Sequence, residues 1–207
     1  MSSRSAEAKA ALRRTLRHAR RALTPDDRER HSAQAARGIA RLPAFRAGRP
    51  VAIYLPFDGE IATKALVSAA KRRGVRLYVP VVTDHRRRRI AFHALTGGMR
   101  TGRYGIPVPR RGAHVLGARW FALIVVPLVG IDPAGRRLGM GGGYYDRAFA
   151  FRGHRRHWRG PFLVGYAFDC QRVDSIFADP WDLAVDALAT ESGVRHHQRA
   201  SAWRHPA

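Results

Sequence analysis

The amino-acid sequence predicts an α/β protein in which three α/β/α layers form around a mostly parallel, Rossmann-like sheet. Its 207 residues are 45% apolar, enough to bury one sizeable core without disulfide or metal support. Apolar runs of strand length alternate with helical patterns through the middle of the chain, as in βαβ units. One such run, residues 121–128, is continuously apolar, which is typical of a strand covered on both faces.

The sequence contains no linker-like segment and no internal repeat. Domain boundaries fall in linkers of distinct composition, so we expect a single α/β domain over residues 1–194. Residues 195–207, rich in His, Arg and Ala, are expected to form a disordered basic tail.

Two helices are predicted at the N-terminus. Residues 5–23 carry apolar or small side chains at helical spacing, with arginines on the other faces. Thr24 then supplies a capping hydroxyl, Pro25 suits the first helical turn, and two aspartates follow near the positive end of the helix dipole. A second helix is therefore expected to begin there and to end near Pro43.

The following segments predict a βαβ unit. Residues 51–56 and 75–82 have the pattern of buried strands, and residues 63–73 between them form a helix that Gly74 stops. Residues 97–112 contain several glycines and prolines and are expected to be mostly loop. The remaining predicted elements are strands over residues 90–95, 121–128, 161–168 and 187–190 and a helix over residues 144–151.

The formal charge of +23 has two explanations, since all but three of the 38 basic residues are arginine. A nucleic-acid surface would neutralise phosphates in this way. The alternative is compositional drift with a general attraction for anions. The excess is spread along the chain, which favours drift, and we expect no specific nucleic-acid partner.

Location in the cell is predicted from what the sequence lacks. No apolar run approaches the ~20 residues of a bilayer span, so we expect no membrane partner. The N-terminal residues lack the apolar stretch of a signal peptide, and the single cysteine, Cys170, agrees with a reducing compartment. These features predict a cytoplasmic protein.

The segment most suggestive of chemistry, residues 121–149, reads FALIVVPLVGIDPAGRRLGMGGGYYDRAF. A buried strand is followed by a turn, a glycine-rich loop and a short helix, which places the loop where open α/β sheets bind ligands. Its N–H groups and the helix N-terminus suit phosphate oxygens, and nearby cations and a carboxylate suit a phosphate with Mg²⁺. The cationic donors are Arg136, Arg137 and Arg147, and the carboxylate is Asp146. The segment predicts a nucleoside triphosphate site.

An alternative for the same segment is that the glycines merely build a tight turn. The loop matches neither the P-loop pattern nor the dinucleotide-binding pattern, because Tyr144 stands in place of the last glycine. Composition and spacing leave both interpretations open.

The stretch RRLGMGGGYYDR resembles the signature RxGxGxGYYD of the 5-formyltetrahydrofolate cyclo-ligase family. Weaker landmarks follow in the family's order: KxxLR at residues 9–13, EIxT at residues 60–63, and two late aspartates, Asp182 and Asp186, before Thr190-Glu191. The resemblance extends over residues 8–191. The central motif is highly specific, and the shared order of the others supports it.

The resemblance implies a reaction, namely conversion of 5-formyltetrahydrofolate and ATP to 5,10-methenyltetrahydrofolate, ADP and phosphate with Mg²⁺. The formyl oxygen would attack the γ-phosphate, and N10 would close the ring on the phosphorylated imidate. The enzyme would be a ligase forming a carbon–nitrogen bond, and we expect a monomer whose partners are the two small substrates. An α/β relative that keeps the nucleotide loop but acts on another one-carbon or sugar-phosphate substrate remains an alternative.

The resemblance also implies site residues. The catalytic residues would be Arg137 and Tyr144, and Mg²⁺ would be held by Asp146 and Asp182, with Asp186 the less favoured neighbour. Folate would contact Leu55, Glu60, Met140 and Tyr144. ATP would contact Lys9, Arg13, Arg137, Leu138, Gly139, Met140, Gly141, Gly142, Gly143, Tyr144 and Tyr145.

Several of these residues have ordinary structural explanations as well. Lys9 and Arg13 could lie on a solvated helix face, Glu60 could be an acid at a helix N-terminus, and Asp182 could be a simple loop acid. Three aromatic residues, Tyr54, Phe57 and Trp120, could offer surface to a ligand, but packing in the core is the favoured role for each.

Overall fold

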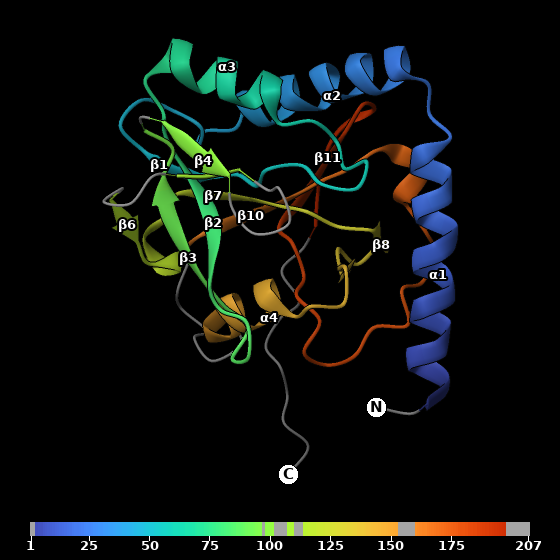
Figure 1. Cartoon of the computed structure of the whole chain (residues 1–207). Helices are drawn as coiled ribbons and strands as arrows, with labels where there is room; N and C mark the ends of the chain where they lie inside the picture. The colour runs from blue at the N-terminus through green and yellow to red at the C-terminus, as the bar shows by residue number, and fades with distance from the viewer. Residues whose placement is uncertain (1–2, 97, 102–106, 110–113, 153–159, 198–207) are drawn as a thin grey trace.

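A mixed sheet organises the computed structural model, which describes residues 3–96, 98–101, 107–109, 114–152 and 160–197 (Figure 1). Within the described residues the sheet has eight strands. In order across the sheet they are β12 (Gly193–His196), β11 (Ala187–Thr190), β10 (Phe162–Tyr166), β7 (Leu123–Val126), β1 (Pro50–Ala52), β2 (Arg76–Asp84), β3 (Arg89–Ala94) and β6 (Val115–Leu116).

The centre of the sheet is parallel. The strands β11, β10, β7, β1 and β2 run in one direction, so their carboxyl ends share one edge. At one side β12 pairs antiparallel with β11, and at the other β3 pairs antiparallel with β2 and then with the edge strand β6. The mostly parallel sheet and the predicted βαβ unit are confirmed, although β1 ends at Ala52, four residues before the predicted end.

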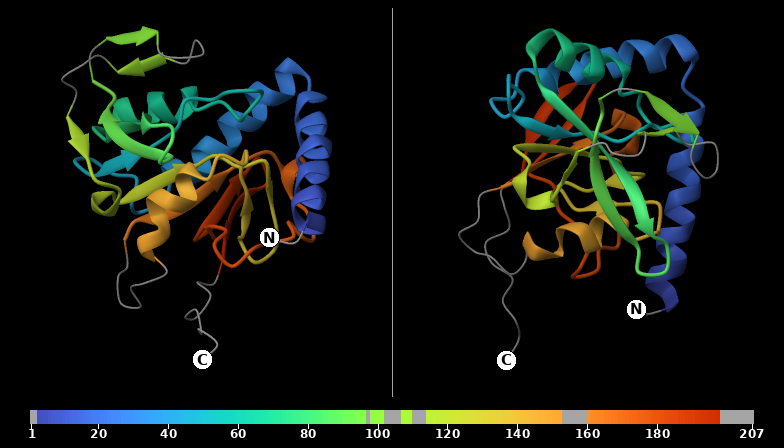
Figure 2. Two further views of the ribbon diagram at one scale, coloured as in Figure 1. Left: turned by 60° about the horizontal axis from the view of Figure 1, so that its bottom comes forward. Right: turned by 60° about the vertical axis from the view of Figure 1, so that its left-hand side comes forward.

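Helices cover both faces of this sheet. The helices α2 (Pro25–Ala40) and α3 (Lys64–Arg73) lie on one face, and α4 (Tyr144–Phe149), continued by the 3-10 turn Ala150–Arg152, lies on the other (Figures 1 and 2). Side chains of a strand alternate between the faces. In β7, Leu123 and Val125 pack in the core beneath α2 and α3, whereas Ile124 and Val126 pack in the core that contains Phe149. The three-layer prediction is confirmed.

Two of the predicted helix boundaries, the start of α2 and the end of α3, rest on local chemistry. The Thr24 hydroxyl accepts a hydrogen bond from the Asp27 N–H at 3.1 Å, and Pro25 begins α2. Gly74 ends α3 with a φ of +63°, a left-handed conformation that glycine adopts without a steric cost. These signals act within a few residues, so the sequence predicts them correctly.

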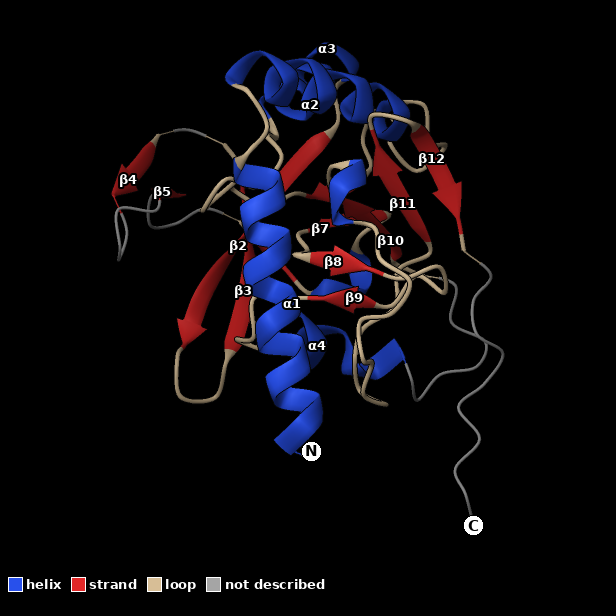
Figure 3. Cartoon of the chain, turned by 90° about the vertical axis from the view of Figure 1, so that its right-hand side faces the viewer, coloured by secondary structure: helices blue, strands red, loops and turns tan. Residues whose placement is uncertain are grey.

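The helix α1 (Ser3–Arg21) stands apart from the two helical layers (Figure 3). It packs against the 3-10 turn Asp169–Gln171 and against β8 (Gly130–Ile131), which pairs with β9 (Arg137–Leu138). Leu16 is buried there, and a Cβ on Gly130 would lie 2.5 Å from its Cδ1. The close packing therefore brings α1 against the segment that leads into the glycine-rich loop.

Two predictions about segments need correction. Within residues 97–112, expected to be mostly loop, β4 (Met99–Thr101) and β5 (Pro107–Pro109) pair antiparallel, and the rest apart from residue 98 lies outside the described residues. The expected tail begins inside β12, because Arg195 and His196 pair with Leu188 and Ala187. Residues 198–207 lie outside the described residues. The 3-10 turn Ala118–Trp120 precedes β7.

Among the helices that the structure describes, none combines the length and the apolar character needed to cross a membrane.

Candidate functional site

The glycine-rich loop, residues 139–143, connects β9 to α4. Gly141 and Gly143 have φ values of +97° and +67°, which L-residues rarely adopt. A Cβ on Gly139 would lie 2.8 Å from Nη1 of Arg137, and one on Gly142 would lie 2.9 Å from the Tyr144 ring. The loop therefore needs glycine for its own geometry, whether or not its amides bind a phosphate.

The other predicted nucleotide residues on this segment fall into two groups. Leu138 is buried in β9, and its carbonyl accepts a hydrogen bond from the Val129 N–H at 2.7 Å. Met140 is 39% exposed, and its Sδ lies 3.2 Å from Nη2 of Arg17. Tyr144 and Tyr145 begin α4. Met140 is thus open to a ligand and the two tyrosines are half-buried, whereas the buried Leu138 can offer only its main chain.

The helix α1 brings two of the predicted residues to this loop. Nε of Arg13 donates a hydrogen bond to the carbonyl of Gly139 at 2.8 Å. Lys9, one helical turn earlier, is 3% exposed. The alternative of a solvated helix face is therefore wrong for this pair, because the face that carries both residues turns toward the protein.

Lys9 is held by two acids from a distant part of the chain. Its Nζ lies 2.7 Å from Oδ2 of Asp179 and 2.5 Å from Oδ2 of Asp182. Burial acts to lower the pKa of Lys9, but the hydrogen bonds and charges of the two acids outweigh it and raise that pKa. Lys9 stays protonated and neutralises the aspartate that the sequence predicts as a metal ligand.

The catalytic candidate Arg137 is almost completely buried. Its Nη2 donates to Oδ1 of Asp146 at 2.9 Å, and its guanidinium carbon lies 5.5 Å from the centroid of the Tyr145 ring. The Leu183 N–H also donates to Oδ1 of Asp146, at 3.3 Å. The structure thus brings the Asp146 carboxylate against the main chain of Leu183, the residue after Asp182.

The residues in this region fit a divalent cation. Within the described residues, Oδ2 of Asp146 and Oδ1 of Asp182 accept no hydrogen bond. Mg²⁺ prefers oxygen ligands, and one or two protein carboxylates commonly hold it together with water and phosphate oxygens. The described residues contain no group of three or more His, Cys, Asp or Glu side chains arranged for a metal. Two carboxylates leave most of the ligand positions of Mg²⁺ to water and phosphate oxygens.

Glu60 lies in the turn that follows β1. Its Oε2 accepts a hydrogen bond from the Phe57 N–H at 3.1 Å. Burial raises the pKa of Glu60 to about 7, against smaller opposing effects of the hydrogen bond from the Phe57 N–H and of the charge of Arg20. The helix α3 begins at Lys64 after Thr63 and has no acid in its first turn, so the alternative of a helix N-terminal acid is wrong. Leu55 is half-buried beside the core under α2 and α3.

Two tyrosines lie near the Glu60 carboxylate. Burial, with a further contribution from the charge of Glu60, raises the pKa of both Tyr54 and Tyr145. Tyr145 belongs to α4, directly after the glycine-rich loop, while Tyr54 belongs to the segment after β1. The charge of Glu60 therefore acts on the first turn of α4, directly after the glycine-rich loop, as well as on its own segment.

The model of the 5-formyltetrahydrofolate cyclo-ligase family matches residues 5–191. The chain belongs to this family. The cyclo-ligase of Escherichia coli K12 is 34% identical over 182 residues, which cover 86% of this chain and 98% of the relative. The cyclo-ligase of Mycolicibacterium smegmatis is 29% identical over 195 residues, covering 90% and 95% of the two chains. Membership makes the chain an enzyme of the ligase class.

Solved structures of the family have the same fold. The NMR structure of Aquifex aeolicus 5,10-methenyltetrahydrofolate synthetase superposes with a TM-score of 0.78 at 29% identity, covering 95% of this chain and 96% of that one. The Mycoplasma pneumoniae 5,10-methenyltetrahydrofolate synthetase gives a TM-score of 0.69 at 23% identity, covering 88% and 98%, and shows the likeness of fold. The resemblance noted in the sequence is confirmed.

The turn between β2 and β3 adds two residues that the sequence analysis missed. The hydroxyl of Tyr144 lies 3.2 Å from Nδ1 of His85. A Cβ on Gly143 would lie 3.5 Å from Nη1 of Arg88. The turn follows the carboxyl end of a parallel strand, the edge at which ligands bind, and this is the signal that could have indicated it.

Other sequence expectations have mixed outcomes. Tyr54 is buried as expected, but Phe57 and Trp120 are 53% and 63% exposed, so the expectation that they pack in the core is wrong for these two.

Asp186, the less favoured metal candidate, is buried. It accepts a hydrogen bond from the Leu163 N–H at 2.7 Å and pairs with Arg152 at 2.8 Å. Its contacts join β10 to the segment before β11 and give it a structural role.

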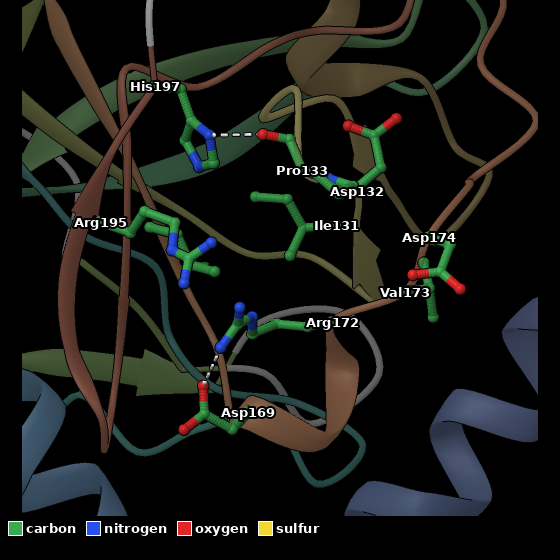
Figure 4. Close-up of a pocket in the computed structure, with 10 residues that line it drawn as sticks. Ile131, Asp132, Pro133, Asp169, Arg172, Val173, Asp174, Arg195 and His197 are labelled. Carbon is green, nitrogen blue, oxygen red and sulfur yellow. Dashed lines mark hydrogen bonds and ion pairs between the residues drawn. The ribbon is translucent and has the colours of Figure 1, made fainter.

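A cavity of about 210 Å³ lies elsewhere, between β8, the turn at Asp169 and β12 (Figure 4). Asp132, Arg195 and His197 are among the residues that line it, and none of the predicted site residues does. Arg172 pairs with Asp169 at 3.5 Å on its wall. Its walls carry charges of both signs and indicate no particular ligand.

Proposed function

We propose that the chain catalyses the ATP- and Mg²⁺-dependent conversion of 5-formyltetrahydrofolate to 5,10-methenyltetrahydrofolate, ADP and phosphate. The observation that supports this most is the meeting of α1 with the glycine-rich loop, where Arg13 donates to Gly139. Relatives of similar length carry the name of this activity. The proposal includes a cytoplasmic monomer with no specific nucleic-acid partner, as the sequence analysis expects.

In this proposal the nucleotide phosphates lie along the amides of residues 139–143. Arg13 and Arg137 neutralise their charge from two sides, and both guanidiniums are already fixed by hydrogen bonds. Phosphoryl transfer depends mainly on positioning and on charge neutralisation, which is what these residues supply. Asp146 and Asp182 would hold Mg²⁺, which supplies a further positive charge to the phosphate oxygens.

The folate would lie between the turn at Glu60 and the start of α4. The Glu60 carboxylate accepts hydrogen bonds from N–H groups of the pterin ring, and Leu55 and Met140 form apolar walls. Tyr144 would touch the substrate while the adjacent main chain touches ATP. This arrangement places the formyl oxygen beside the γ-phosphate.

The chemistry proceeds in two steps. The formyl oxygen attacks the γ-phosphorus, and ADP leaves with the electrons of the broken P–O bond. The lone pair of N10 then attacks the imidate carbon, N10 loses its proton, and the carbon–oxygen bond breaks to release phosphate. An amide oxygen is a poor leaving group until it is phosphorylated, which explains the need for ATP. Arg137 and Tyr144 act by orienting and neutralising the reacting groups.

The test is a direct assay of the purified protein with 5-formyltetrahydrofolate, Mg²⁺ and ATP. We expect the absorbance of the methenyl product to appear, with one ADP formed per product and no product when ATP is omitted. A folded sample that forms no methenyl product under any ATP condition would contradict the proposal. ATP consumption that other one-carbon or sugar-phosphate compounds stimulate, and 5-formyltetrahydrofolate does not, would support a relative with another substrate.

A further inference from the structure

Three arginines of α1 converge on one aspartate in the turn after β1. Nη2 of Arg20 lies 3.3 Å from Oδ2 of Asp58, and Nε of Arg17 lies 3.5 Å from the same oxygen. Arg21 pairs with Oδ1 of Asp58. Nη2 of Arg20 also donates a hydrogen bond to the Asp58 carbonyl at 2.5 Å. Arg20 therefore contacts both the carboxylate of Asp58 and the main chain of the turn.

Arg20 differs from the other two arginines in its burial. Its side chain has no exposed surface, whereas that of Arg21 is 59% exposed. Its Nε and Nη1 are buried and have no hydrogen-bond partner among the described residues. A buried cation with unpaired donors costs free energy, and such a group in a folded protein calls for an explanation beyond stability.

The turn that Arg20 holds has an unfavourable backbone. Asp58 has a φ of +51° and Gly59 a φ of +77°, so two consecutive residues are left-handed. A residue other than glycine adopts this conformation at a cost in free energy, and surrounding contacts are needed to maintain it. Its result is to turn the Glu60 carboxylate back onto the Phe57 N–H, beside Tyr54 and Tyr145.

We propose that Arg20 is a positioning residue for the folate site, which holds the turn of residues 57–60 so that the Glu60 carboxylate faces the pterin ring. The inference rests on the proposed function, because it takes Glu60 as the folate contact. Arg20 has no direct hydrogen bond to Glu60 among the described residues, and it acts on Glu60 through the Asp58 carbonyl that it holds and through its charge. Its loss should therefore affect the use of folate and spare the use of ATP.

The test compares two arginines on the same aspartate. We expect Arg20→Met to raise the KM for 5-formyltetrahydrofolate about tenfold, with the KM for ATP and kcat changed less than about threefold. Arg21→Ala, the exposed control, should change all three by less than about twofold, because exposed ion pairs contribute little. Arg20→Lys retains a charged donor and should restore part of the folate affinity. The helix α1 also carries Lys9 and Arg13, so a change that merely loosened this helix would raise the KM for ATP as much as the KM for 5-formyltetrahydrofolate. That result would overturn the inference.

A double-mutant cycle with Glu60→Gln separates this inference from the proposed function. If Arg20 acts through Glu60, the variant with both changes should have the folate KM of Glu60→Gln alone. Additive effects, or a raised folate KM in Glu60→Gln without one in Arg20→Met, would overturn the positioning role only. An unchanged folate KM in Glu60→Gln would contradict the folate site itself. Should Arg20→Met fail to fold, Arg20→Lys takes its place in the cycle. A folate KM raised by more than about threefold is then the expected result, and an unchanged folate KM would overturn the inference.

Discussion

Nζ of Lys9 lies 2.5 Å from Oδ2 of Asp182, although 173 residues separate the two in the chain. The contact joins the first helix to the segment before β11 and adds a second acid, Asp179, at 2.7 Å. All three side chains are mostly buried. A predicted nucleotide contact and a predicted metal ligand are thus parts of one charged cluster, and a change to either affects both.

Replacement of Lys9 tests this cluster. Lys9→Met leaves two mostly buried carboxylates without their cation, so we expect the free energy of unfolding to fall by about 2–3 kcal/mol. The proposed nucleotide site predicts a rise of about tenfold or more in the KM for ATP as well. Urea unfolding and ATP kinetics measure the two effects. Arg14→Ala, an exposed change on the same helix, is the control, and equal results for both variants would show that the cluster has no special role.

Asp146→Asn tests the proposed metal ligand. The amide oxygen can still accept from Arg137 and from the Leu183 N–H, but the buried Arg137 loses its counter-charge, so we expect the free energy of unfolding to fall by about 1–3 kcal/mol. The turnover rate at saturating ATP should fall about 100-fold or more, and the Mg²⁺ concentration that gives half-maximal turnover should rise. Asp174→Asn, at an exposed position, is the matched control. Turnover like that of the unchanged enzyme at low Mg²⁺ would contradict the assignment of Asp146.

Gly141→Val tests whether the glycine-rich loop binds phosphate. The control is Gly48→Val, at a glycine outside the loop that also has a positive φ. Gly141 has a φ of +97°, and a Cβ there would lie 3.8 Å from Cζ of Arg13. Gly48 has a φ of +71° with nothing within 4 Å of a Cβ. Both valine variants should lose of order 1–3 kcal/mol of stability from backbone strain. Only Gly141→Val should also block the approach of phosphate and reduce kcat/KM for ATP. A similar loss of activity in both variants would assign the effect to folding.

The raised pKa of Glu60 predicts a pH dependence of stability. The folded protein retains on Glu60, up to about pH 7, a proton that an unfolded chain releases near its ordinary pKa of 4.5. The folded state binds more protons in this window, so the free energy of unfolding falls as the pH rises from about 4.5 to about 7. Glu60→Gln should remove this decrease. Urea midpoints of both proteins at about pH 5 and about pH 8 measure it, and an equal pH dependence in the two would contradict the shift.

The same group predicts a pH dependence of substrate use. If the ionised Glu60 carboxylate accepts the pterin N–H groups, kcat/KM for 5-formyltetrahydrofolate should rise with pH through about 7 and then level. The groups whose charge acts on Glu60 are Arg17, Arg20 and Asp58, and Tyr54 and Tyr145 are its neutral neighbours. Initial rates at limiting folate and saturating ATP measure the profile. A profile that falls across this range would indicate that the protonated form binds the substrate.

The accuracy of the sequence predictions depended on the range of the interactions involved. The Thr24 cap, the Gly74 stop and the apolar strand β7 are set by contacts within a few residues or by a simple periodicity, and all were predicted. The pair β4 and β5 was missed because glycine and proline indicate loops, while strand pairing depends on a partner elsewhere in the chain. The exposure of Trp120 was missed because side-chain type alone does not decide burial.

By itself, the sequence determined the order and type of the main elements, the family, and the segment on which the chemistry is expected, since these depend on local patterns and on a specific motif. Only the tertiary structure decided which distant side chains meet: Lys9 with Asp179 and Asp182, Tyr144 with His85, and Arg20 with Asp58. Such contacts depend on how helices and strand ends pack at one edge of the sheet. No local pattern encodes that packing, because many different sequence separations can produce the same short distance.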